Sequence, residues 1–209
     1  MQIAIISTGN IGSGLASVLG RTAHDVTVSD RSGGRTAAEK LTGEGARVSA
    51  AEIGAAVVDA DVVILATPFG ALKSIAQTAD FAGKTVIDVS NSVTEDFSGL
   101  SVGQTTSAAE EIAAALPGAV VVKALNTVFA EHYASGLGAG GQPIQTFVAS
   151  DDDAARAAVI CLAGEIGLEG VDAGPLSNAR YLEPLGFMNI TFGYMSGRGT
   201  GIAPFWPSN

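Results

Sequence analysis

A glycine-rich segment near the start of the chain combines residue types and a spacing that suit phosphate binding. It reads Ser7-x-Gly9-x-x-Gly12, follows a short apolar run and opens a segment with apolar residues at helical spacing, Ile11–Arg21. In the pattern G-x-G-x-x-G, the second glycine lets the backbone approach a pyrophosphate, and the third lets the helix pack closely on the preceding strand. Amide groups at the helix N-terminus then face the phosphates. The segment therefore predicts dinucleotide binding, although Ser7 takes the place of the first glycine in the tight turn.

The residues after the second predicted strand, Asp25–Asp30, bear on the choice between NAD and NADP. A carboxylate at this position accepts hydrogen bonds from the ribose hydroxyls and repels a 2′-phosphate, whereas an arginine does the reverse. Asp30 favours NAD. Arg31 and Arg35 can reach a 2′-phosphate, and a planar guanidinium there could also stack on adenine, but Arg35 could equally be a solvated residue at the start of a helix. Two arginines against one aspartate favour NADP and leave NAD open.

The elements that must position these residues alternate between strand-like and helix-like segments. Asp61–Thr67, Thr85–Asn91 and Ala119–Leu125 are apolar on both faces, as parallel strands covered by helices on both sides must be. Repeated β-α-β order predicts an α/β fold of the Rossmann type, a doubly wound parallel sheet. Further strands are expected at Gln2–Ser7, Arg47–Ser49, Ile144–Ala149 and Glu169–Asp172, and further helices at Arg35–Gly43, Phe69–Phe81, Ala108–Leu116, Phe129–Ser135 and Asp151–Ile166.

The C-terminal part has a different pattern. Leu176–Gly197 holds few charges and has large apolar residues at mixed helical spacing, which predicts a helix buried in its own subunit or against a partner. We therefore expect a Rossmann domain over residues 1–170 and a small helical segment over residues 171–209 that serves dimerisation and the substrate pocket. The tail after Gly197 ends in Phe205 and Trp206, and we expect these rings to dock at the mouth of the nicotinamide pocket or at the dimer seam beside it.

The bulk composition limits the partners that the protein can have. The chain has 209 residues and a net charge of −10, with no basic patch, so we expect no nucleic-acid partner. The apolar runs are too short to span a bilayer, and we see no signal peptide. Cys161 is the only cysteine, which excludes an intrachain disulfide and fits a reducing, cytoplasmic compartment.

Four stretches are distinctive when taken together: STGNIGSGLA at Ser7–Ala16, TPF at Thr67–Phe69, KALNTVFAEH at Lys123–His132 and DAGPLSNARYLEPLGFMN at Asp172–Asn189. They resemble the family of NADP oxidoreductases that use coenzyme F420, a deazaflavin. The resemblance covers nearly the whole chain and implies a Rossmann domain with a small C-terminal helical part that helps to form a homodimer. It also implies NADP(H) as one substrate and, in deazaflavin-using members, hydride transfer between NADPH and oxidised F420.

The resemblance also implies the cofactor contacts, position by position. The family's Ser-Arg pair after the second strand falls on Asp30 and Arg31, so Asp30 replaces a small hydroxyl residue and weakens the case for strict NADP preference. Thr200 matches a position near the reactive ring. The expected cofactor-binding residues are Thr8, Gly9, Asn10, Ile11 and Gly12 in the turn, Asp30, Arg31 and Arg35 after the second strand, Thr67, Pro68, Phe69, Ser90 and Asn91 at later strand ends, and Thr200 in the tail.

Side chains for acid–base or metal chemistry are scarce. The histidines are His24 and His132, and neither they nor Cys161 form a catalytic or metal-ligand pattern, so we expect no catalytic side chain and no metal. Hydride transfer to a flavin or deazaflavin needs mainly two rings held face to face, because the cofactor carries the chemistry. His132 could line a pocket or lie on a helix surface, and Lys123 is either a structural charge or a substrate contact.

Three functions stay open on the sequence. The first is a reductase that moves a hydride between NADPH and F420 or a flavin-like acceptor. The second uses the same nicotinamide site with another small acceptor, such as an imine or a carbonyl compound. The third is a non-catalytic NADP-binding redox sensor, because a fold does not determine a function. A deazaflavin carries anionic groups, and Arg180 and Arg198 are the candidate cations for them in the C-terminal part.

Overall fold

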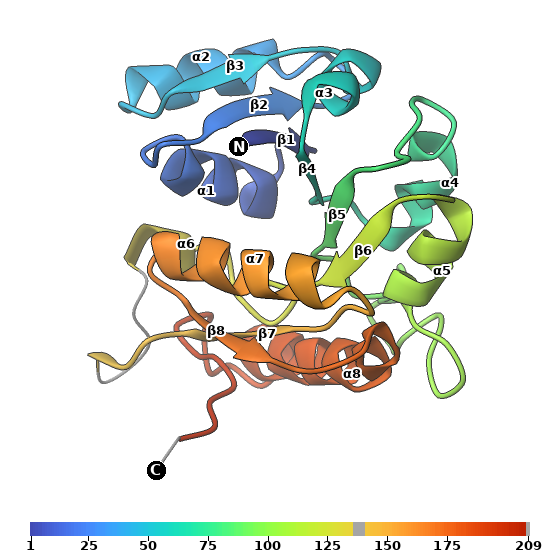
Figure 1. Ribbon diagram of the computed structural model, residues 1–209. Coiled ribbons are helices and arrows are strands. Elements are labelled where there is room, and N and C mark those ends of the chain that lie inside the picture. The colour runs from blue at the N-terminus through green and yellow to red at the C-terminus, as the bar shows by residue number, and fades with distance from the viewer. Residues whose placement is uncertain (136–140, 208–209) are drawn as a thin grey trace.

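The computed structural model describes residues 1–135 and 141–207, and its main layer is a six-stranded parallel sheet (Figure 1). The strand order is β3-β2-β1-β4-β5-β6, the order of a Rossmann fold, in which two halves meet between β1 and β4. The predicted fold class and these six strands are therefore confirmed. The strands are β1 (Gln2–Ile6), β2 (Asp25–Ser29), β3 (Val48–Ala50), β4 (Val62–Leu65), β5 (Thr85–Asp88) and β6 (Val120–Lys123).

Helices cover both faces of this sheet, because alternate residues of each strand bury their side chains on opposite sides. In β1, Ile3 and Ile5 join a core cluster with α1, α2 and α7, whereas Ala4 and Ile6 join a second cluster with α3, α4 and α5. The helices are α1 (Asn10–Leu19), α2 (Arg35–Gly43), α3 (Ile53–Asp59), α4 (Leu72–Ile75), α5 (Ala108–Ala115), α6 (His132–Ser135), α7 (Asp153–Glu165) and α8 (Ala179–Ile190).

The last two strands form a sheet of their own. β7 (Gln145–Val148) and β8 (Glu169–Asp172) pair in parallel, and a single bridge between Lys123 and Ala149 links this small sheet to β6. α7 covers one of its faces, and α8 lies on the other side (Figure 1). Phe147 and Ala149 pack against Leu182 of α8. Residue periodicity identifies the two strands but cannot show which sheet a strand joins.

Two helical segments differ from the sequence-based expectation. The predicted helix Phe69–Phe81 is wrong beyond Ile75: a 3-10 turn (Phe69–Ala71) leads into the single turn of α4. The hydroxyls of Ser74 and Thr78 donate to the carbonyls of Ala71 and Ile75, and such local bonds compete with helix continuation. Conversely, α3 has only seven residues, too few to show helical periodicity in the sequence.

The C-terminal segment is helical, as expected. A 3-10 turn (Leu176–Asn178) precedes α8, and a π-helical turn (Thr191–Met195) follows it. In the part of the chain that the structure describes, no helix is long and apolar enough to cross a membrane.

Candidate active site

The turn between β1 and α1 has the geometry that its sequence pattern predicts. Ser7 has a φ of 91°, in the left-handed region where glycine is usual. A Cβ on Gly12 would lie 1.9 Å from the Ser7 carbonyl oxygen, so glycine is required there for α1 to pack on β1. At Gly9, by contrast, the nearest atom to an added Cβ is Ser7 Oγ at 3.7 Å, an ordinary contact. Protein atoms therefore leave the space at Gly9 open, beside the first amides of α1, which have no partner within the helix.

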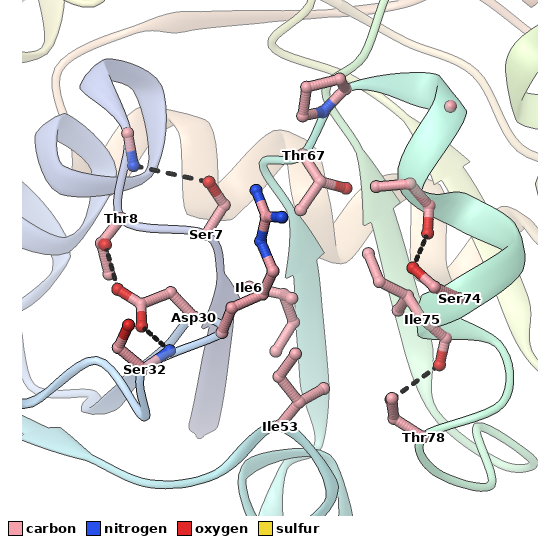
Figure 2. A pocket seen from close by; sticks show the side chains of 15 residues that line it. Ile6, Ser7, Thr8, Asp30, Ser32, Ile53, Thr67, Ser74, Ile75 and Thr78 are labelled. Atoms are coloured by element: carbon pink, nitrogen blue, oxygen red, sulfur yellow. Dashed lines mark hydrogen bonds between the residues drawn. The ribbon is translucent and has the colours of Figure 1, made fainter.

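A cavity of about 800 Å³ opens beside this turn, large enough for the adenosine half of a dinucleotide (Figure 2). Ile53 and Ile75 give it apolar surface on which a planar base could rest. Its lining comes from the turn (Ile6, Ser7, Thr8 and Gly9), the loop after β2 (Asp30, Arg31 and Ser32), α3 (Ile53) and the segment after β4 (Thr67, Pro68, Gly70, Ala71, Ser74, Ile75 and Thr78).

Asp30 ties the loop after β2 to the glycine turn. Thr8 Oγ1 donates to Asp30 Oδ2 at 2.5 Å, and the Ser32 amide donates to Oδ1 at 2.7 Å (Figure 2). The Gly34 amide also donates to Oδ1, at 3.0 Å. These hydrogen bonds, that from Thr8 above all, hold the pKa of the Asp30 carboxyl below its ordinary value. Each carboxylate oxygen therefore already has a donor from the protein.

The two arginines after β2 are placed differently from each other. Arg31 is exposed and lines the large cavity, whereas Arg35 is exposed at the first position of α2 and does not line it. Within the described residues, neither guanidinium has a hydrogen bond or an ion pair to the protein. A cation at a helix N-terminus gains nothing from the helix dipole, so the dipole does not account for Arg35 at this position.

A smaller cavity of about 190 Å³ lies at the carboxyl ends of β5 and β6. The turn contributes Ile11, the segment after β5 contributes Val89 and Asn91, and the C-terminal helices contribute Gly186, Asn189, Ile190 and Tyr194. The remaining lining residues follow β6: Leu125, Asn126, Thr127, Val128 and Phe129. Because Ile11 lines this cavity and Gly9 the larger one, both cavities adjoin the glycine turn.

A third cavity, of about 440 Å³, lies between α8 and the C-terminal tail. The tail is docked on β7: Gln145 exchanges hydrogen bonds of 2.7 and 2.9 Å with the backbone of Trp206, and the Trp206 ring meets the Phe147 ring edge-on at 5.2 Å. Asn189 lines both this cavity and the smaller one. The cavity is otherwise lined by Leu185, Met188, Phe192, Arg198, Ile202, Ala203, Pro204, Phe205 and Trp206.

Comparison with known proteins identifies the family. The model of the NADP oxidoreductases that depend on coenzyme F420 matches residues 2–92, which include the turn, Asp30 and Asn91. The hypothetical protein SMa0349 from Sinorhizobium meliloti shares 31% identity and a TM-score of 0.75, over 86% of this chain and 88% of that one. The chain belongs to this oxidoreductase family. A candidate F420-dependent NADP reductase from Arthrobacter sp. FB24 shares 28% identity and a TM-score of 0.80, over 94% of this chain and 95% of that one.

Membership makes this protein an NADP-dependent oxidoreductase. The same architecture occurs in a reductive aminase from Aspergillus terreus that was solved with NADPH and ethyl levulinate. That likeness, with a TM-score of 0.68 and 19% identity over 94% of this chain and 62% of that one, shows the fold alone.

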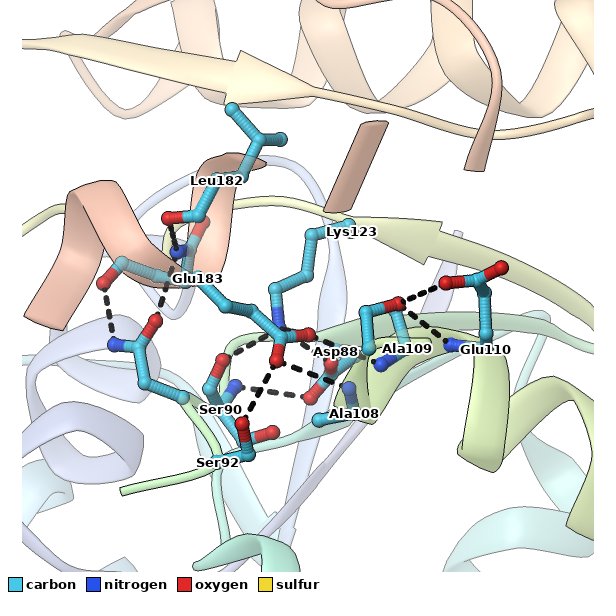
Figure 3. Close-up of polar contacts among 12 residues, drawn as sticks. Asp88, Ser90, Ser92, Ala108, Ala109, Glu110, Lys123, Leu182 and Glu183 are labelled. Carbon is cyan, nitrogen blue, oxygen red and sulfur yellow. Dashed lines mark hydrogen bonds and ion pairs between the residues drawn. The ribbon is translucent and has the colours of Figure 1, made fainter. Parts of the chain in front are cut away.

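Lys123 of the oxidoreductase is a structural charge. Its ammonium lies 2.6 Å from Asp88 Oδ2 and 3.1 Å from Glu183 Oε1, and it also donates to the Ser90 carbonyl (Figure 3). Glu183 of α8 in turn accepts from the Ser92 hydroxyl and from the amides at residues 108 and 109, where α5 begins. The Lys123 and Asp88 side chains are fully buried, and ions this deep persist only when each has partners. The network fastens α8 to the ends of β5 and β6.

The structure separates the other expected site residues. The sequence-predicted residues that line none of these three cavities are Asn10, Gly12, Arg35, Phe69, Ser90 and Thr200. Thr200 Oγ1 instead donates to Glu131 Oε2 at 2.5 Å. The Ser90 side chain is buried, and its Oγ has no hydrogen-bond partner within the described residues. His132 is buried too, with Nε2 3.2 Å from the Ile202 carbonyl, so it holds the tail rather than lying on a helix surface.

Sequence reasoning assigned no role to several residues of the smaller cavity. Asn126, Thr127, Gly186 and Asn189 all lie inside two of the four stretches that carry the family resemblance. The sequence feature that points to this cavity is the polar Asn-Thr pair directly after a buried strand, because ligands bind at the edge of the sheet where such strands end.

Proposed function

We propose that this oxidoreductase transfers a hydride between NADPH and a deazaflavin such as coenzyme F420, or a flavin-like acceptor. The observation that carries the proposal is the position of Asn189, which lines both the small cavity beside the turn and the cavity under the tail. A nicotinamide ring in the first cavity would adjoin an acceptor ring in the second. Adjacent ring sites are what hydride transfer between two cofactors requires.

The surroundings of the larger cavity favour NADP over NAD. Arg31 lines that cavity and has no hydrogen bond or ion pair from its guanidinium within the described residues. A planar, permanently charged guanidinium suits a 2′-phosphate. Asp30 already accepts three hydrogen bonds from Thr8, Ser32 and Gly34, so its charge is offset by local donors. We therefore assign Arg31 as the residue that selects the 2′-phosphate. The hydrogen bond between Asp30 and Thr8 holds the loop that carries Arg31 against the glycine turn. NAD remains the alternative that measurement can test.

The cavity under the tail has the composition that an aromatic acceptor needs. Met188, Phe192 and Trp206 offer apolar surface, and the Arg198 guanidinium lies 4.9 Å from the centre of the Phe192 ring. Arg180, the other candidate cation, is paired with Glu110 at 2.8 and 2.5 Å and is not free for a ligand. Arg198 is therefore the better partner for the anionic tail of a deazaflavin.

The proposed reaction needs no side chain as acid or base. NADPH gives a hydride, with its electron pair, to the acceptor ring; the ring takes one proton from water, and NADP⁺ leaves. The protein's part is to hold the two rings in contact and to keep water out of the space between them.

Two further assignments concern the roles of the two segments of the chain and its oligomeric state. We assign residues 1–170 to dinucleotide binding and residues 171–209 to the acceptor pocket and to a homodimer contact. Tyr181, Met188, Phe192 and Met195 form an exposed apolar row along α8 and the turn after it, with Tyr181 74% exposed. Symmetric dimers commonly cover such a row. Light scattering should then give twice the 20.9 kDa chain mass, whereas a persistent monomer would contradict the dimer.

The decisive experiment is steady-state oxidation of NADPH with F420, FMN, FAD and a panel of small imines and carbonyl compounds, with NADH measured in parallel. We expect the highest kcat/KM with NADPH and F420. Turnover with an imine or a carbonyl compound alone would show that the acceptor belongs to that class instead. Tight NADPH binding without turnover on any acceptor would favour a redox sensor.

A further inference from the structure

A segment near the end of the chain forms one continuous wall of the third cavity. Residues 202–206, called the strap below, are consecutive, and all of them line this cavity of about 440 Å³. The strap belongs to no helix or strand. Within the described residues, the last backbone–backbone hydrogen bond before it joins the Gly199 amide to the Gly193 carbonyl, and none involves the strap itself. The position of the strap therefore depends on side chains from the rest of the protein.

Gln145 holds the strap by both polar groups of one backbone residue. Its Oε1 accepts from the Trp206 amide at 2.7 Å, and its Nε2 donates to the Trp206 carbonyl at 2.9 Å. Turning the Gln145 amide over would set donor against donor and acceptor against acceptor, so the two bonds fix its orientation. Gln145 begins β7 and is 2% exposed, which leaves its side chain little freedom to follow a moving strap.

The other end of the strap has a single hydrogen bond. His132 Nε2 lies 3.2 Å from the Ile202 carbonyl oxygen. Among the described residues, Gln145 therefore makes two of the three hydrogen bonds that join the strap to the rest of the protein. The aromatic rings of the strap remain exposed in part, 45% for Phe205 and 58% for Trp206, so packing alone does not fix them. Gln145 is thus the main polar anchor of this wall.

We propose that Gln145 is a positioning residue, which seats the strap over the third cavity and thereby sets the affinity for the acceptor. The inference rests on the proposed function, because that function places the acceptor in this cavity. Without the two bonds to Trp206, the strap is out of place in a larger fraction of molecules. The apparent affinity for a ligand falls in proportion to the fraction of molecules that can bind it, whereas the turnover of the bound complex is retained. The strap lines neither cavity assigned to the dinucleotide, so NADPH affinity does not depend on it.

Gln145→Met tests this role, because Met has a similar length and lacks the amide groups. Trp206 is the only tryptophan of the chain, so its fluorescence reports directly on the strap. In the variant without ligand, acrylamide should quench Trp206 more strongly, and its emission should shift to longer wavelength. With F420 as the acceptor, and with FMN in parallel, the KM for the acceptor should rise about tenfold while kcat stays within about threefold. The Kd for NADPH, measured by calorimetry, should stay unchanged.

Ser150→Ala is the matched control. Ser150 follows β7 and is 1% exposed, and its hydroxyl donates to the Val121 carbonyl at 2.8 Å, so the variant weakens the same region without touching the strap. Urea unfolding of both variants measures the loss of stability. In Ser150→Ala, that loss should leave the quenching of Trp206 and the KM for the acceptor unchanged.

The two readouts separate the steps of the inference. Unchanged quenching of Trp206 in Gln145→Met would show that Gln145 does not seat the strap. Stronger quenching with an unchanged acceptor KM would show that the strap does not border the acceptor. A higher acceptor KM in Ser150→Ala as well would reduce Gln145 to a contribution to stability. If wild-type protein oxidises NADPH with neither F420 nor FMN, the proposed function fails, and the role of Gln145 in acceptor binding fails with it.

Discussion

The hydroxyl of Thr8 donates to the Asp30 carboxylate at 2.5 Å, which joins the glycine turn to the loop after β2 across 22 residues of sequence. Two parts of the proposed dinucleotide site are thereby held at a fixed separation. The contact also gives the acidic residue after β2 a structural role, because Asp30 accepts this hydrogen bond in the protein without a ligand. Its charge therefore need not indicate that NAD is the ligand.

The first prediction concerns this choice of nucleotide. Arg31→Ala should weaken NADPH at least tenfold, about 1.4 kcal/mol, and NADH by less than about threefold, because only NADPH carries the 2′-phosphate. Arg35→Ala should have the smaller effect, since Arg35 does not line the cavity. Calorimetric affinities of both nucleotides for both variants check this. Tighter binding of NADH than of NADPH by wild-type protein would show that Asp30 selects the nucleotide instead.

The glycine turn allows a ligand effect to be separated from a folding effect. Gly9→Ala places a methyl group where no protein atom lies closer than 3.7 Å, so the melting temperature should stay unchanged. The methyl group would obstruct a pyrophosphate, and NADPH affinity should fall at least tenfold, about 1.4 kcal/mol. Gly12→Ala should instead lower the melting temperature, because its Cβ would meet the Ser7 carbonyl oxygen at 1.9 Å. Unchanged affinity in Gly9→Ala would remove the turn from the binding site.

The buried network at Lys123 should dominate the attachment of α8. Lys123→Met leaves the carboxylates of Asp88 and Glu183 buried without their cation, and breaking such an ion pair costs about 3–5 kcal/mol. Urea unfolding measures this loss. Adding Glu183→Gln to Lys123→Met removes one of the two unpaired charges and should recover part of the stability. A single variant as stable as wild-type protein would contradict this account of the network.

A surface pair gives the expected pH dependence of stability. The Arg180 guanidinium holds the pKa of Glu110 below its ordinary value of 4.5. Because the folded-state pKa is the lower one, the stabilisation is fully present above about pH 5 and is lost as the pH falls through the folded-state pKa. Arg180→Met should therefore be less stable than wild-type protein at pH 7, and the difference should shrink below pH 4.5. Urea unfolding at pH 7 and at pH 3.5 compares the two, and a constant difference would exclude the linkage.

The tail should matter for the acceptor more than for the nucleotide. Deleting residues 200–209 removes the wall of the third cavity and the hydrogen bonds of Trp206 to Gln145. NADPH affinity should stay within about threefold, whereas turnover should fall about a hundredfold, because a misplacement of the acceptor by ~1 Å can cost that much. Turnover is measured per folded molecule, since the loss of packing on Phe147 should also lower the melting temperature. Unchanged turnover per folded molecule would show that the tail contributes to stability but not to the acceptor site.

The sequence by itself determined the elements and the order in which they occur. Apolar runs such as Asp61–Thr67 predict buried strands from their own composition, and the spacing of Ser7, Gly9 and Gly12 predicts the turn, because both depend on residues close together in the chain. Only the tertiary structure showed that Lys123 pairs with Asp88 and Glu183, that Asp30 accepts from Thr8, and that Asn91 orients Asn126. These contacts join residues 22 to 60 positions apart, and the direction of each hydrogen bond depends on which backbones the packing of α8 and the sheet brings together. Local pattern therefore locates the polar residues at the strand ends, while long-range packing decides which of them are satisfied by the protein and which are left free for a ligand.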